Sequence, residues 1–89
     1  MTRADRLRAV LSDALRPTTI EVVDDSARHA GHAGARDGGE THYSVLVVSD
    51  RFAGMSRVAR SREVHGLLQS EFDTGLHALG LTLKAPGEA

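Results

Sequence analysis

The fold of this chain is decided by residues 41–54, whose sequence is THYSVLVVSDRFAG. Residues 43–48 alternate between two faces and are rich in β-branched side chains, without an internal Pro or Gly. One face carries Tyr43, Val45 and Val47, and the other carries Ser44, Leu46 and Val48. This pattern is typical of a central strand, and we expect both of its faces to be largely buried.

A turn and the start of a helix follow this strand. Ser49 and Asp50 are expected to end the strand, because short polar side chains compete for backbone hydrogen bonds. Phe52 and Gly54 indicate a tight apolar turn, and residues 51–55 are a candidate for a short separate helical turn. The rest of the chain is expected to pack around this strand–turn–helix unit.

Two longer helical segments are predicted. The first covers residues 3–15, with Thr2 as its N-cap and Asp5 completing a capping box. Its apolar stripe comprises Leu7, Val10, Leu11, Ala14 and Leu15, whereas Arg3, Arg6, Arg8 and Asp13 are expected to lie outside. The second begins after Ser56 and ends before Gly75, which suits the left-handed position past a helix end. Its apolar face is predicted to be Val58, Val64, Leu67, Leu68 and Phe72.

Two further strands complete the predicted sheet, over residues 18–24 and 77–83. Between the first strand and the central one, residues 25–40 are rich in glycine and small polar residues, which indicates a mobile loop. The order of elements predicts an α+β two-layer sandwich, with helices covering one face of a three-stranded sheet. We expect a single domain over residues 1–89, with a frayed tail at 85–89.

The composition indicates a small protein without sulfur chemistry of its own. The chain has 89 residues, a formal net charge of −1 and no cysteine, so it has no disulfide and no thiolate metal ligand. This net charge does not indicate strong non-specific binding to nucleic acid or to an anionic membrane. No run approaches the roughly 20 apolar residues that span a bilayer, so we expect a cytoplasmic protein with no membrane partner.

The motifs of common enzyme classes are missing from the sequence. It has no nucleophile elbow, no Walker loop and no Gly-x-Gly-x-x-Gly after a strand. Asp24 and Asp25 are adjacent at a strand end, so their side chains point apart rather than pairing as an acid and a base. We therefore expect no catalytic residues and no enzyme activity.

Four segments in register resemble the BolA family. They are residues 29–36 (HAGHAGAR), 39–43 (GETHY), 47–54 (VVSDRFAG) and 76–79 (LHAL). The apolar strand followed by Ser-Asp-Arg-Phe-x-Gly is the most specific part, and the likeness covers nearly the whole chain. The resemblance implies a fold similar to the class II KH domain, with the element order α-β-β-α-α-β.

The resemblance also implies a partner and a shared cofactor. BolA proteins pair with monothiol glutaredoxins and share a [2Fe-2S] cluster with them, in iron–sulfur assembly or iron regulation. The glutaredoxin and glutathione supply thiolates, and the BolA chain supplies histidine. The family's ligand before the last strand falls on His77, and its loop ligand falls on His29, with His32 as the rival. No cofactor is expected on the isolated chain, which we expect to be a monomer or a weak dimer.

Two positions depart from the family pattern. The second long helix usually contains Arg-His-Arg, but this chain has Arg60-Ser61-Arg62, so any role of that helix histidine is absent. The last strand commonly ends with Thr-Pro and an aromatic tail, but here Lys84-Ala85-Pro86-Gly87 follows. We expect the second departure to alter the packing of the C-terminus and part of a partner surface.

Each histidine also has an ordinary structural interpretation. His77 could be satisfied by a backbone hydrogen bond at the strand end, and His29 and His32 could be solvated loop residues. His42 is expected to help close the loop by a hydrogen bond, and His65 to be a surface or boundary residue. As cluster ligands, neutral histidines would raise the reduction potential and make the site sensitive to pH.

Arginines near the turn predict a second type of partner surface. Arg51, Arg57, Arg60 and Arg62 surround Phe52, a combination that interfaces favour, although a solvated charged face is the ordinary alternative. The resemblance to the BolA family also implies an alternative function, a KH-like nucleic-acid-binding transcriptional regulator with DNA as its partner, to which this surface would contribute phosphate contacts. KH domains use a Gly-x-x-Gly loop, whereas the turn here reads Phe52-Ala53-Gly54-Met55. The glutaredoxin adaptor is therefore the first expectation.

Overall fold

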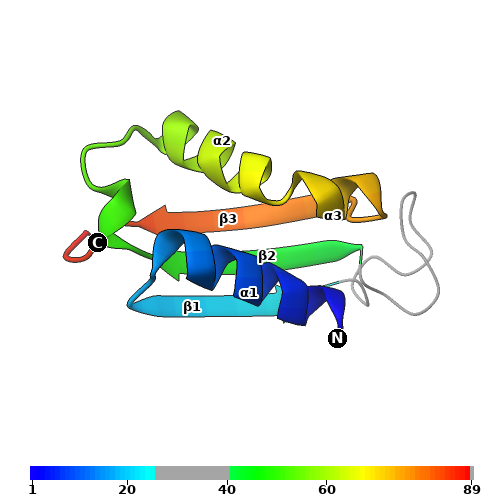
Figure 1. The fold of residues 1–89 in the computed structure, drawn as a ribbon. Helices are drawn as coiled ribbons and strands as arrows, with labels where there is room; N and C mark the ends of the chain where they lie inside the picture. Colours follow the sequence, from blue (N-terminus) through cyan, green and yellow to red (C-terminus); the bar gives the residue numbers. More distant parts are fainter. Residues whose placement is uncertain (26–40, 89) are drawn as a thin grey trace.

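The computed structural model describes residues 1–25 and 41–88 of this chain. Its elements are α1 (Arg3–Leu15), β1 (Thr19–Asp24), β2 (His42–Val48), the 3-10 helix η2 (Asp50–Phe52), α2 (Arg57–Leu67), α3 (Gln69–Asp73) and β3 (Ala78–Lys84). Figure 1 shows the predicted α+β architecture, with a three-stranded sheet and a short separate helical turn after β2. The loop predicted over residues 25–40 falls almost entirely outside the described residues.

The central strand of the sheet is β2, because the strand order is β1-β2-β3. β1 pairs with it in the antiparallel sense, with Thr19 opposite Val48. β3 pairs in the parallel sense, with His42 opposite Ala78 and Val48 opposite Lys84. A parallel pair needs a crossover connection, which the helical segment from η2 to α3 provides. The first residues of β2 and β3 therefore meet at one end of the sheet.

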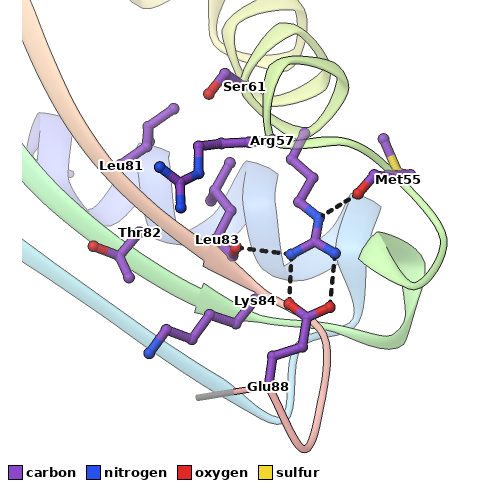
Figure 2. A pocket seen from close by; sticks show the side chains of 9 residues that line it. Met55, Arg57, Ser61, Leu81, Thr82, Leu83, Lys84 and Glu88 are labelled. Carbon is purple, nitrogen blue, oxygen red and sulfur yellow. Dashed lines mark hydrogen bonds and ion pairs between the residues drawn. The ribbon is translucent and has the colours of Figure 1, made fainter.

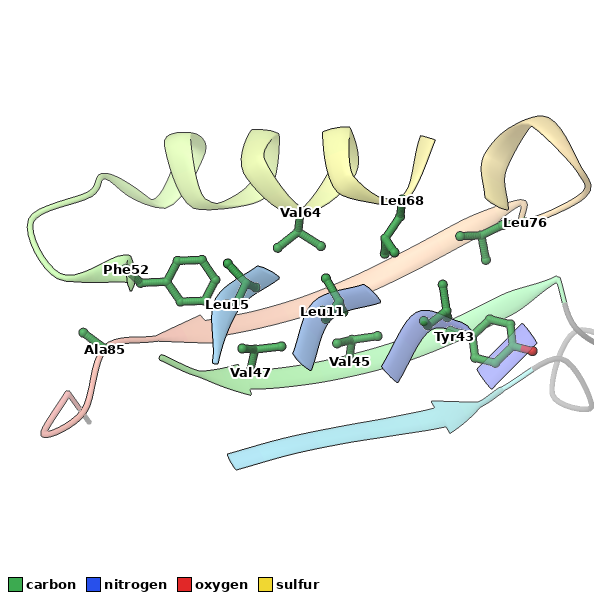
Figure 3. Close-up of a cluster of buried hydrophobic side chains, with 11 residues drawn as sticks. Leu11, Leu15, Tyr43, Val45, Val47, Phe52, Val64, Leu68, Leu76 and Ala85 are labelled. Carbon is green, nitrogen blue, oxygen red and sulfur yellow. The ribbon is translucent and has the colours of Figure 1, made fainter. Parts of the chain in front are cut away.

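The helices of the described chain cover only one face of the sheet. Tyr43, Val45 and Val47 point into a core shared with α1 and α2 (Figure 3), and each is at most 2% exposed. The helices contribute Leu7, Leu11, Leu15, Val64 and Leu68 to this core. On the opposite face, Ser44 is exposed, and Leu46 and Val48 are half-buried. The expectation that both faces of the central strand are largely buried is therefore wrong.

The local signals for the helix ends are confirmed, but the single helix predicted between Ser56 and Gly75 is divided at Leu68 into α2 and α3. The Thr2 hydroxyl accepts from the Asp5 amide, and the Asp5 carboxylate accepts from the Thr2 amide, each at 3.1 Å. The Ser56 hydroxyl accepts from the Ala59 amide at 3.1 Å and caps α2. Gly75 follows α3 with φ +127°, a conformation that glycine adopts most easily. None of the helices in the described ranges is long and apolar enough to cross a membrane.

Three expectations about which residues face the core are wrong. Val10 and Val58 are 36% and 58% exposed, so they do not belong to the apolar faces of their helices. Arg3 is expected from the sequence to lie outside, but it is 7% exposed.

The last strand begins one residue later than predicted, so His77 precedes β3 instead of opening it.

Arg3 is buried because α3 covers the first turn of α1. Its Nη1 donates to Oε1 of Glu71 at 2.8 Å and to the Glu71 carbonyl at 3.0 Å. Arg6 Nε donates to Oε2 of the same carboxylate at 3.0 Å. The hydrogen bond from Arg6, together with the charges of both arginines, holds the pKa of the Glu71 carboxyl below its usual value. This network therefore fixes the first turn of α1 to α3.

Residues 85–88 fold back onto the domain, which differs from the frayed tail that the sequence predicts. Ala85 is 6% exposed and belongs to the core. The Glu88 carboxylate accepts from Arg60 Nη1 and Nη2 at 2.6 and 2.8 Å, and from the Ala85 amide at 2.9 Å. The turn that brings it there contains Gly87 at φ +87°.

Candidate functional site

Two histidines that are far apart in the sequence meet at one end of the sheet. His42 opens β2, and His77 immediately precedes β3. The parallel register brings their imidazole rings to a centroid separation of 5.4 Å, with an interplanar angle of 51°. His42 is only 6% exposed, whereas His77 is exposed. The site therefore presents one imidazole on the surface and packs a second one behind it.

The backbone of His77 is held in place by the start of β2. The amides of His77 and Ala78 both donate to the Thr41 carbonyl, at 2.7 and 3.1 Å. The Thr41 hydroxyl lies 2.8 Å from Nδ1 of His42, which positions the buried ring. An exposed imidazole on a fixed backbone suits donation to a metal that another molecule carries, because little ordering is required.

The described residues do not form a complete metal site of their own. In residues 1–25 and 41–88, no group of three or more His, Cys, Asp or Glu side chains could hold a metal ion. The whole chain lacks cysteine, so any thiolate ligand has to come from another molecule. His77 as a ligand stays a prediction. His29 and its rival His32 lie outside the described residues, so the choice between them stays open.

His42 is the residue of this site that sequence reasoning underestimated. The sequence suggested a hydrogen-bonding role in loop closure, and the structure adds its contact with His77. The available signal was that His42 and His77 stand at the starts of two predicted strands, which meet only if those strands are parallel neighbours. His65 is exposed on α2, as expected for a surface residue, and stacks on Phe72 at 5.2 Å.

The predicted surface of arginines around Phe52 is corrected in one respect. Phe52 is completely buried at 0% exposure, so it is a core residue and not part of a partner surface. The η2 turn directs its ring inward between the helices and the sheet (Figure 3). Arg51, Arg57 and Arg62 are exposed and remain candidates for contact with a partner.

Arg60 differs from the other arginines because its side chain stabilises the fold. Its guanidinium lies 5.8 Å from the centroid of the Phe52 ring. It also donates to the carbonyls of Met55 and Leu83, each at 3.1 Å, in addition to its ion pair with Glu88. A substitution of Arg60 would therefore disturb packing as well as surface charge.

A pocket of about 480 Å³ lies between α2 and β3. Figure 2 shows Arg57 entering it from α2, with Lys84 at the end of β3 and Glu88 below, and Arg60 of α2 also lines it. The side-chain hydrogen bond from Arg60, helped by the Ala85 amide, lowers the pKa of Glu88 to about 2. Glu88 is therefore ionised at neutral pH, and three cations and one carboxylate line this pocket.

Comparison with known proteins finds one family. A family model described as BolA-like protein matches residues 11–88. The UV-induced protein uvi31 of Schizosaccharomyces pombe is 49% identical over 92 residues, which cover 99% of this chain and 90% of that protein. The DNA-binding transcriptional regulator BolA of Escherichia coli is 40% identical over 77 residues, which cover 86% of this chain and 70% of that protein. The solved structure of the BolA domain of SufE1 from Arabidopsis thaliana is 44% identical, with a TM-score of 0.90. The match covers 100% of this chain and 98% of that domain.

Proposed function

This chain belongs to the BolA-like protein family, and from that premise we propose that it is a non-catalytic adaptor for a monothiol glutaredoxin. In this role it shares or relays a [2Fe-2S] cluster, to which glutaredoxin and glutathione contribute thiolates and His77 contributes an imidazole. The observation that supports this proposal is the exposed ring of His77 on a fixed backbone, in a chain without cysteine. A loop histidine, His29 or its rival His32, would provide the second ligand.

The imidazole of His77 offers chemistry that a thiolate does not. A neutral ligand in place of a thiolate removes negative charge, which raises the reduction potential of an iron–sulfur centre. Only a deprotonated ring nitrogen can bind iron, so the bond between an imidazole ligand and the cluster is expected to weaken as the pH falls. The buried ring of His42 packs against His77 and limits the orientations that the ligand ring can take.

The test is an anaerobic titration of this protein into a cluster-loaded monothiol glutaredoxin, followed by visible circular dichroism. The wild type is expected to change the cluster spectrum and to form a one-to-one complex. His77→Ala is expected to weaken this effect by at least about tenfold, since loss of even an outer partner of a metal ligand commonly costs about 10- to 100-fold. His29→Ala and His32→Ala then identify the loop ligand.

The matched control is His65→Ala, which removes an exposed histidine of α2 and should leave the spectral change intact. Far-ultraviolet circular dichroism of each variant checks that the fold is retained. If the wild type leaves the glutaredoxin spectrum unchanged, the adaptor proposal fails for that partner. If His77→Ala behaves as the wild type does, a different residue supplies the ligand.

A second candidate function is nucleic-acid binding, which the name of the Escherichia coli relative and the exposed Arg51, Arg57 and Arg62 favour. We rank it second because the formal net charge is −1. If it is correct, duplex DNA should bind at physiological salt, with an affinity that falls steeply as salt rises. Arg57→Ala combined with Arg62→Ala should lower the salt slope by about 2 if both arginines contact phosphates. Fluorescence anisotropy measures both quantities, and absence of binding at physiological salt would exclude this function.

A further inference from the structure

We propose that the pocket between α2 and β3 binds a carboxylate on an acidic segment of a partner protein, and that Glu88 occupies this place in the free chain. Figure 2 shows the Glu88 side chain reaching up from the C-terminal turn into the pocket, where its carboxylate accepts from the guanidinium of Arg60. The chain itself thus demonstrates which ligand chemistry this pocket accepts, because both terminal nitrogens of Arg60 donate to one carboxylate.

The pocket contains more cationic than anionic side chains, so its net charge favours binding of a further anion. Arg57, Arg60 and Lys84 line it, but Glu88 is its one acidic residue. Within the part of the chain that the structure describes, neither Arg57 nor Lys84 forms a salt bridge. The pocket therefore carries a net positive charge even with Glu88 in place, and an incoming carboxylate is attracted to it.

The internal carboxylate is held in a way that allows exchange. The Glu88 side chain is 42% exposed and stands on a short turn near the end of the chain, closed by the hydrogen bond from its amide to the Ala85 carbonyl at 3.2 Å. The Arg60 side chain is only 12% exposed and keeps its contacts with Met55 and Leu83, but the carboxylate side of the ion pair faces solvent, where water and salt screen it. A partner carboxylate that makes additional contacts can therefore displace Glu88 without unfolding the domain.

The surroundings of the cations favour a protein segment over a free phosphate or a nucleic acid. Leu81 and Leu83 give the pocket an apolar wall. β3 is an edge strand, and the Leu83 carbonyl already accepts from Arg60 at this edge, so backbone acceptors face the pocket. An extended segment with alternating acidic and apolar side chains matches both features. The pocket lining contains no aromatic residue on which a base could stack.

This pocket is separate from the histidine pair. His77 lies four residues before Leu81, where the pocket lining on β3 begins, and seven before Lys84, which corresponds to about 13 to 23 Å at the usual rise of a strand. A ligand at the pocket can therefore bind while His77 is engaged elsewhere. The inference does not rest on the glutaredoxin function, and the two can fail independently.

The test is a titration of the ¹⁵N-labelled protein with an end-blocked Glu-Leu-Glu-Leu-Glu peptide, followed by amide chemical shifts. Saturable shifts are expected at residues 81–84. Glu88→Gln removes the competing carboxylate and is expected to tighten binding about two- to fivefold. Arg57→Ala combined with Lys84→Ala is expected to weaken binding about tenfold, because two charge-assisted contacts are lost.

The controls separate this site from general electrostatics. Arg62→Ala removes an exposed arginine of α2 that does not line the pocket, and His77→Ala alters the other end of β3, so both should bind the peptide as the wild type does. The proposal is overturned if neither the wild type nor Glu88→Gln shows saturable shifts, or if a Gln-Leu-Gln-Leu-Gln peptide binds equally well. It is also overturned if inorganic phosphate or oligothymidylate shifts residues 81–84 and the acidic peptide does not.

Discussion

Phe52→Ala is expected to lower the free energy of unfolding by about 3–5 kcal/mol, the range for removing a buried aromatic ring from a core. The ring is 0% exposed and belongs to the buried core (Figure 3). Its loss leaves a cavity and removes the surface on which the Arg60 guanidinium rests. Small domains commonly have only about 5–15 kcal/mol of stability, so this variant should be close to unfolding at room temperature. Urea denaturation followed by circular dichroism measures the change.

The matched control is Arg51→Ala, which changes the neighbouring exposed residue and should alter stability by no more than about 0.5 kcal/mol. The pair distinguishes a core role of Phe52 from the surface role that the sequence suggested. If Phe52→Ala proved as stable as Arg51→Ala, the buried position of this ring would be refuted.

Glu71→Gln is expected to destabilise the fold by roughly 3 kcal/mol at neutral pH, because it leaves a buried arginine without its counter-charge. The Glu71 and Arg3 side chains are each 9% exposed, and Arg6 binds the same carboxylate. The amide of glutamine retains the shape of the side chain, so the loss reports on charge and hydrogen bonding. Urea denaturation of the variant and the wild type at pH 7 gives this difference.

The same residue predicts a pH dependence with a definite sign. The pKa of Glu71 is lowered in the folded state from its ordinary value of 4.5, chiefly by the hydrogen bond from Arg6. Its contribution to stability is therefore complete above about pH 4.5 and is lost as the pH falls through the folded-state pKa. The difference in the free energy of unfolding between the wild type and Glu71→Gln should therefore shrink as the pH falls through that pKa. Glu63→Gln, at an exposed position of α2, is the control. If it lost as much stability as Glu71→Gln, the stabilising role of the ion pairs between Glu71 and the two arginines would be contradicted.

The local elements of this protein could be predicted from short-range signals in the sequence. The capping box of Thr2 and Asp5, the Ser56 cap and the alternation of residues 43–48 each depend on residues within a few positions of one another. Such interactions are governed by the local backbone, so they are readable before any tertiary contact is known. The family was likewise recognisable, because its four segments lie in a fixed order along the chain.

The errors concern residues whose environment depends on other elements. Periodicity shows which residues share a stripe, but it does not show which neighbour covers that stripe. Arg3 is buried because α3 lies over the first turn of α1, and Val58 is exposed because α2 turns that position away from the core. Hydrophobicity alone likewise did not show that the described helices leave one face of β2 uncovered.

The sequence by itself determined most elements of the described fold, although not the division of α2 from α3, and it determined the family, whose pattern made His77 the first candidate ligand. Only the tertiary structure placed His42 beside His77, by pairing β2 and β3 in parallel, and assembled the pocket in which Arg60 holds Glu88. The physical reason is range. Caps and strand alternation are set by neighbouring residues, whereas the strand order and the covering of each face depend on the packing of the whole chain.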